Sequence, residues 1–202
     1  LSLGSSVALA VDQDTGEELF SKNAGIELPI ASVTKLMTAL VIAESGLKMD
    51  ERIRITREDY VRSHARSKLR SGMRMTRGAV LKAALMSSDN RAATALARTY
   101  PGGRKAFVRK MNETAARLEV IRDSSTMQFS SIRAGRQQLK LVTTNRLIGN
   151  PDWNIGVQKT GFTTAAGRCM VVQSEFADRR VVMVLLDSPN SAQRAADMQT
   201  MR

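Results

Sequence analysis

The chain reads PIASVTKLMT at residues 29–38, and this stretch predicts where a helix begins and what the helix carries. A proline precedes apolar residues at helical spacing, and Gly46 marks the end of the pattern. Ser32 opens the helix and Lys35 follows one helical turn later, so both side chains lie on the same face. A serine hydroxyl becomes a good nucleophile when a base removes its proton, and a helix N-terminus favours the negative charge that develops. Ser32-Val33-Thr34-Lys35 therefore predicts a serine nucleophile with a lysine base.

A second copy of the same spacing tests how specific the pattern is. Ser45-Gly46-Leu47-Lys48 also places lysine three residues after serine, but its glycine breaks the helix and the geometry is lost. For Ser32 the alternative is an ordinary N-cap serine at a helix start. The motif alone does not decide whether Ser32 is a catalytic residue or a helix cap.

A Ser-x-Asn motif, Ser88-Asp89-Asn90, joins two apolar segments with helical spacing. At such a connection Ser88 can carry a proton to a leaving amine, and Asn90 can hold a substrate amide. The alternative is a helix cap. The same pattern at residues 21–23 and 188–190 falls at predicted strand ends, where such residues turn the chain.

A third motif, Lys159-Thr160-Gly161, follows apolar residues on a predicted strand. A lysine that points inward from a sheet is costly unless it meets an anion, and a substrate carboxylate would satisfy it with a hydrogen bond from Thr160. Gly161 would allow a ligand backbone to approach closely. Lys159 could also be the second cation that lowers the pKa of Lys35. The alternative is a solvent-facing lysine before a turn.

The order of predicted elements indicates an α+β fold, with an antiparallel sheet built from both chain ends, flanked by helices, and an inserted helical lobe. Residues 122–150 show no clear period. We expect a single catalytic domain of residues 1–202, with a sheet lobe at about 1–50 and 150–202 and a mostly helical lobe at about 51–149. The predicted strands are 6–11, 17–21, 52–56, 155–160, 168–174 and 180–186, and the predicted helices start at 32, about 78, 90, about 105 and 191.

Other catalytic arrangements find little support. The one histidine, His64, lies among arginines with nothing to hold it, which disfavours a Ser-His-Asp triad and excludes a His-rich metal site. Asp14-Thr15-Gly16 resembles an aspartic-protease motif, but a second copy is missing and its neighbours indicate a hairpin turn. The one cysteine, Cys169, excludes an intramolecular disulfide. We expect no metal and no cofactor.

The chain is strongly basic, with a formal net charge of +12. Basic residues cluster at 62–77, but aromatic residues make up 4% of the chain, which is poor for stacking on bases. We therefore expect no specific nucleic-acid partner, and interpret the charge as a solvated face or as attraction to an anionic polymer such as a cell wall. Apolar runs such as 181–186 are too short to cross a bilayer, so we expect no transmembrane segment.

The motifs and their flanks resemble one protein family. The chain is similar to the low-molecular-mass penicillin-binding proteins of the serine D-Ala-D-Ala peptidase family, in the D-alanyl-D-alanine endopeptidase branch. The resemblance covers residues 1–120 and 150–202. It is carried by PIASVTKLMT at 29–38, LMSSDNRAA at 85–93, YPGG at 100–103, Phe107, WNI at 153–155, KTGFT at 159–163 and AGRC at 166–169.

The resemblance implies a mechanism and a fold like that of the serine β-lactamases and D,D-peptidases. Ser32 would attack the carbonyl of a D-Ala peptide bond in peptidoglycan, with Lys35 as base, and water would release the acyl group. Penicillins and other β-lactams would trap Ser32 covalently. The other implied site residues are catalytic Ser88, the substrate-binding residues Asn90, Lys159, Thr160 and Gly161, and an oxyanion hole of the backbone N–H groups of Ser32 and Phe162.

Two departures from the family pattern help to decide which activity of the family this chain has. The stretch between the helical lobe and the third motif is short and lacks a Pro-Thr-Gly-Leu turn. A Glu-x-x-Leu-Asn segment, which class A β-lactamases use for deacylation, is also missing. We therefore favour a penicillin-sensitive D,D-endopeptidase, and keep a D-Ala-D-Ala carboxypeptidase, a class A-like β-lactamase and a non-catalytic binder of an anionic polymer as alternatives.

The resemblance also predicts the location of the protein and a role for one further residue. The chain starts at Leu1 without a signal peptide, so a periplasmic, exported protein is expected from the resemblance alone. Arg194 is a candidate for binding a substrate carboxylate.

Overall fold

The structure is a computed structural model and describes residues 1–62, 66–115, 129–134, 137–145 and 147–202. These residues form two compact units, Leu1–Thr34 with Asn145–Arg202, and Lys35–Thr144. The first unit contains a sheet built from both chain ends and the second contains most of the helices, which confirms the predicted α+β fold. The single catalytic domain, with lobes divided near residues 50 and 150, stays a prediction.

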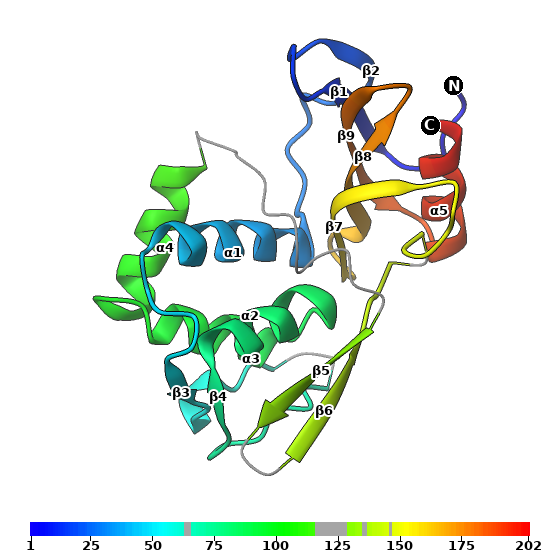
Figure 1. The fold of residues 1–202 in the computed structure, drawn as a ribbon. Coiled ribbons are helices and arrows are strands. Elements are labelled where there is room, and N and C mark those ends of the chain that lie inside the picture. The colour runs from blue at the N-terminus through cyan, green and yellow to red at the C-terminus, as the bar shows by residue number, and fades with distance from the viewer. Residues whose placement is uncertain (63–65, 116–128, 135–136, 146) are drawn as a thin grey trace. The chain divides into compact units, whose positions relative to one another are not determined.

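The first unit is built on a five-stranded antiparallel sheet in the order β2-β1-β9-β8-β7 (Figure 1). Each predicted strand here is present. The two strands predicted at 155–160 and 168–174 are longer than expected, because their ladder continues until Thr163 pairs with Gly167. The third motif therefore lies inside a strand. The strands are β1 (Val7–Asp12), β2 (Glu18–Lys22), β7 (Asn154–Thr163), β8 (Gly167–Phe176) and β9 (Arg179–Ser188).

Both faces of this sheet are covered. Helix α5 (Ser191–Thr200), capped by the side chain of Asn190, packs Met198 against Ala8 and Met183 on one face. On the opposite face, Ala31 and Val33 of the 3₁₀ helix η1 (Ala31–Val33) pack with Val7 and Leu186. In the continuous apolar run of β9, Val181, Met183 and Leu185 are buried on one face, and Val182 and Val184 are half-buried on the other.

In its described residues, the second unit packs the four helices α1 to α4 around one apolar core. Thr76 accepts a hydrogen bond from the Ala79 N–H at the start of α2, and Asp89 caps α3 in the same way. The predicted strand 52–56 is shorter than expected, and it pairs with an additional strand, β4. The elements are α1 (Thr34–Glu44), β3 (Arg52–Arg54), the 3₁₀ helix η2 (Arg57–Asp59), β4 (Arg74–Thr76), α2 (Arg77–Met86), α3 (Asn90–Arg98) and α4 (Gly103–Thr114).

A hairpin of β5 (Phe129–Ala134) and β6 (Gln137–Val142) lies in the part of the sequence that showed no period. Both strands contact α2, and Leu141 is buried in the core of this unit. Leu139 and Leu141 alternate with polar residues, so the signal was present but short.

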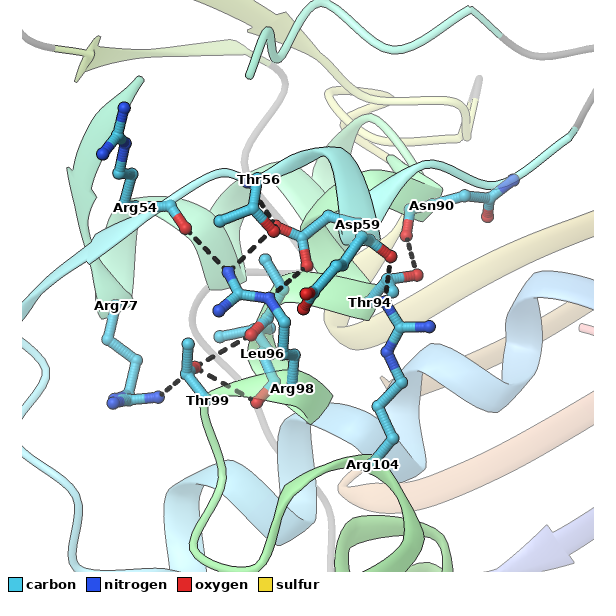
Figure 2. Close-up of polar contacts among 12 residues, drawn as sticks. Arg54, Thr56, Asp59, Arg77, Asn90, Thr94, Leu96, Arg98, Thr99 and Arg104 are labelled. Atoms are coloured by element: carbon cyan, nitrogen blue, oxygen red, sulfur yellow. Dashed lines mark hydrogen bonds and ion pairs between the residues drawn. The ribbon is translucent and has the colours of Figure 1, made fainter. Parts of the chain in front are cut away.

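An ion pair between partly exposed Arg98 and buried Asp59 fixes the end of α3 (Figure 2). Arg98 Nε donates to Asp59 Oδ1 at 2.7 Å, and Arg98 Nη2 donates to the Arg54 carbonyl at 2.7 Å. The Asp59 carboxylate also accepts from the Thr56 N–H at 2.7 Å and so caps η2. Within the described residues, no helix combines the length and the apolar character that crossing a membrane requires.

Candidate active site

Ser32 lies in the middle of η1, which leads directly into α1. The N-cap of this turn is Ile30, so Ser32 does not occupy the capping position that was its alternative. The preceding residue, Ala31, has a φ of 47°, which is unusual for a residue with a Cβ. Strained backbone of this kind clusters at functional positions, where the surrounding structure holds it in place.

Gly161 lies against the turn that carries Ser32, within the first unit. A Cβ built on Gly161 would lie 2.8 Å from the Ile30 carbonyl oxygen and 3.0 Å from the Ser32 backbone nitrogen. The motif predicts that this glycine lets a ligand backbone approach closely. In the structure the close backbone is the chain's own turn, so the missing side chain lets β7 hold the Ser32 turn.

The remaining residues of the third motif are also placed by β7. Lys159 is fully buried and Thr160 is nearly so, which makes the solvent-facing alternative for Lys159 wrong. Lys159 Nζ donates to the Thr160 carbonyl at 2.6 Å. Phe162 is half exposed, and the Arg168 guanidinium lies 4.0 Å from its ring centroid. The strand thus buries the Lys159 cation and leaves Phe162 half exposed.

Lys35, Ser88 and Asn90 meet within the second unit. Lys35 is buried on α1, and its Nζ donates to Asn90 Oδ1 at 2.6 Å and to Ser88 Oγ at 3.5 Å. Burial lowers the pKa of Lys35 from 10.5 to about 8, while the charge of nearby Asp89 opposes that shift. A buried amine held by neutral acceptors is more easily deprotonated than an exposed one, which suits a general base.

In the turn between α2 and α3, one residue caps α3 and its two neighbours contact Lys35. Asp89 Oδ1 accepts from the Ala92 N–H at 3.0 Å and caps α3. Ser88 has a φ of 54°, a second positive value at a predicted site residue. Asp89 therefore takes the capping role that was the alternative for this motif, while the side chains of Ser88 and Asn90 contact Lys35.

The rival motifs take structural roles in the described part of the chain. Asp14-Thr15-Gly16 forms the β1–β2 turn, where Asp12 Oδ1 accepts from the N–H groups of Asp14 and Thr15 at 2.9 Å each. Asp14 pairs with Arg180. His64 lies outside the described residues.

Arg194 and Cys169 are neighbours in the first unit. Arg194 is buried on α5, and its Nη1 donates to the Cys169 carbonyl at 3.3 Å. Burial raises the pKa of the Cys169 thiol. Carboxylate binding by Arg194 stays a prediction.

A serine on a strained turn, followed along the helix by a buried lysine bonded to a Ser-x-Asn turn, defines the class of active-site serine hydrolases. The family described as D-alanyl-D-alanine carboxypeptidase matches residues 2–128 and 118–190. The chain belongs to this family of serine peptidases, the low-molecular-mass penicillin-binding proteins.

Individual relatives agree with this family. The chain is 36% identical over 238 residues to a D-alanyl-D-alanine endopeptidase of Pseudomonas aeruginosa, covering 99% of this chain and 76% of that protein. It is 30% identical to a D-alanyl-D-alanine endopeptidase of Escherichia coli, with coverage of 99% and 76%. The Pseudomonas alignment is longer than the 202 residues of this chain, so that relative carries residues that are missing here. The two family matches overlap at 118–128, close to the stretch before the third motif that is shorter than in the family pattern.

Solved structures share the fold. Penicillin-binding protein D2 from Listeria monocytogenes in its ampicillin-bound form is 25% identical, with a TM-score of 0.80 and coverage of 99% of this chain and 96% of that one. A variant of a Streptomyces DD-transpeptidase has a TM-score of 0.87 at 22% identity, with coverage of 99% and 96%. These neighbours confirm the predicted D,D-peptidase-like fold.

Proposed function

We propose that this chain is a penicillin-sensitive D,D-endopeptidase that cuts D-Ala peptide bonds in peptidoglycan cross-links through an acyl-enzyme on Ser32. One observation carries the proposal. The Lys35 amine is buried, bonded to Asn90 and Ser88, and has a pKa lowered to about 8. This amine follows Ser32 by one helical turn, so the lysine is prepared to act as a base for that hydroxyl.

The proposed reaction begins with proton transfer. Neutral Lys35 takes the proton of the Ser32 hydroxyl, and Oγ attacks the D-Ala carbonyl carbon. The backbone N–H groups of Ser32 and Phe162 stabilise the oxyanion. Ser88 passes the proton to the leaving amine as the C–N bond breaks. Water then attacks the ester, which releases the acyl group and restores the serine.

The other predicted residues bind substrate in this scheme. Asn90 holds a substrate amide, and Thr160 donates a hydrogen bond to a substrate carboxylate whose charge Lys159 balances. Gly161 acts by keeping β7 close to the Ser32 turn, since a Cβ there would collide with that turn. A peptidoglycan substrate places the enzyme outside the cytoplasmic membrane, in the periplasm of a bacterium that has two membranes.

Covalent labelling tests the nucleophile. Incubation with benzylpenicillin should add the mass of one inhibitor to the intact protein, and Ser32→Ala should abolish the addition. Ser45→Ala is the matched control, because Ser45 belongs to the second copy of the spacing and lies beyond α1. No label on the wild type, or a label that survives in Ser32→Ala, would refute the proposal.

Product analysis separates the endopeptidase from the carboxypeptidase that the family description names. The enzyme is given cross-linked and uncross-linked muropeptides at equal concentration. We expect faster loss of the cross-linked form, in line with the two relatives named as endopeptidases. Predominant release of free D-Ala would assign the carboxypeptidase activity instead.

A further inference from the structure

A cavity of about 210 Å³ opens beside the Ser88-Asp89-Asn90 turn, and all of its lining residues belong to the second unit. Its lining combines polar, cationic and apolar residues, among them Ser88 and Asn90, the cationic side of Arg66 and Lys68, and Leu139 and Leu141 of β6. Such a combination fits an aliphatic chain that ends in an anionic group.

The backbone that carries the two cations is held beside the motif by hydrogen bonds of Ser67. Ser67 lies between Arg66 and Lys68, and its Oγ donates to Asp89 Oδ2 at 2.7 Å. The Leu69 N–H donates to Ser67 Oγ at 3.0 Å, and Leu69 itself is buried in the core. Asp89 therefore connects the start of α3 to the loop that carries the two cations.

A second contact holds the same loop. The Arg91 guanidinium, on the first turn of α3, donates to the Leu69 carbonyl. Arg91 also lies 5.6 Å from the ring centroid of Tyr60. Tyr60 and Leu69 thus both contact Arg91 of α3, and Ser67 contacts Asp89, so the backbone between Arg66 and Lys68 lies beside the motif.

The charge balance of the cavity favours an anion. Its described lining contains the cations Arg66 and Lys68 and one carboxylate, Asp89. That carboxylate already accepts from Ser67 and from the Ala92 N–H, which stabilises its charge. Both cations are exposed, so they can reach a group that enters from solvent.

We propose that Arg66 and Lys68 form a subsite that binds a peptide carboxylate carried on an aliphatic chain, with the chain lying against Leu139 and Leu141. This inference rests on the proposed function, since it assigns the subsite to the same peptide substrate. It also gives a role to part of the basic stretch 62–77. Other cations of that stretch have other positions: Arg77 is buried and paired with Glu51 at 2.8 Å.

A charge-matched pair of variants tests the subsite. Arg66→Gln/Lys68→Gln removes the two cavity cations. Arg70→Gln/Arg74→Gln removes two exposed cations of the same stretch that do not line the cavity. The substrates are two D-Ala–D-Ala peptides that differ at one aliphatic side chain, which ends in a carboxylate or in the matching primary amide.

We expect the Arg66/Lys68 variant to lose about 10-fold in kcat/KM on the carboxylate peptide, mainly through a higher KM, because it loses charge-assisted hydrogen bonds. The amide peptide should change by less than about twofold, and so should the acylation rate with benzylpenicillin. The control pair should behave like the wild type on both peptides.

Equal losses on the two peptides, or an equal loss in the control pair, would overturn the subsite. Calorimetric binding of the two peptides in a Ser32→Ala background gives the same comparison without turnover. There, equal affinity of the carboxylate and amide peptides would also overturn it. Failure of the wild type to be acylated by benzylpenicillin would instead refute the proposed function, so the two proposals fail separately.

Discussion

Lys35 and Arg98 are both cations of the second unit held by short hydrogen bonds, yet their partners differ. Arg98 is paired with the buried Asp59 carboxylate, and its pKa is raised by that hydrogen bond. Lys35 is bonded to an amide oxygen and a hydroxyl, and burial lowers its pKa to about 8. The first cation keeps its charge and stabilises the fold, whereas the second can lose its proton near neutral pH. Burial brings the Lys35 amine close to losing its proton, whereas a guanidinium stays charged in proteins, so only the lysine can serve as a base.

The largest expected effect is at Lys35. Replacement Lys35→Met removes the base, so the rate of acylation by benzylpenicillin should fall by about a thousandfold. The free energy of unfolding should change by less than about 1 kcal/mol, because the Asn90 and Ser88 groups to which Lys35 donates are uncharged. Stopped-flow acylation and denaturant unfolding measure the two quantities. Acylation at the wild-type rate would show that another group is the base.

The opposite result is expected at Arg98. Arg98→Met leaves the buried Asp59 carboxylate without its guanidinium and should cost about 3 kcal/mol of unfolding free energy. Acylation of the folded protein should change by less than about twofold, because the ion pair does not contact Lys35. Arg104→Met is the control, since Arg104 bonds the backbone carbonyl of Glu58 at the surface (Figure 2) and should cost less than about 0.5 kcal/mol. An equal loss of stability in both variants would contradict the account of the Asp59 pair.

A smaller effect should follow from Asp89, whose charge raises the pKa of Lys35. Asp89→Asn keeps a side chain that caps helices well, and removes the negative charge. The pKa of Lys35 should therefore fall, and the pH profile of acylation should move to lower pH. The profile of wild type and variant, measured in the same buffers, checks the direction. A shift to higher pH would contradict the assigned sign.

The smallest expected effect is at Asp12, a paired carboxylate in the first unit. Hydrogen bonds from the Thr15 N–H and from Arg179 lower the pKa of Asp12 from 3.8 to about 2. Since the folded-state pKa is the lower one, this stabilisation is present above about pH 4 and is lost as the pH falls towards about 2. Unfolding free energies of the wild type should decline across that window, and those of Asp12→Asn should decline less. Parallel curves for the two proteins would contradict the prediction.

Local sequence signals predicted most of the fold. The strands of the large sheet and the first residues of α3 and α5 follow from periodicity and from capping residues that act within three positions of each other. The β5–β6 hairpin was missed because Leu139 and Leu141 give only two alternating positions. Two apolar residues cannot be distinguished from chance in a polar stretch.

The site was predicted as a set of residue types but not as a set of contacts. The three motifs named Ser32, Lys35, Ser88, Asn90 and Lys159. The tasks of Asp89, which caps α3 and accepts from Ser67, depend on a partner 22 residues away in the chain. The close approach of Gly161 to the Ser32 turn joins residues still further apart. Such tertiary contacts leave no periodic signal in a single sequence.

The most direct test of the central claim is the pH dependence of acylation of the wild-type enzyme by benzylpenicillin. If neutral Lys35 is the base for Ser32, the rate constant rises with pH and levels off with an apparent pKa of about 8. A rate constant that does not change between about pH 6 and about pH 10 would contradict the claim.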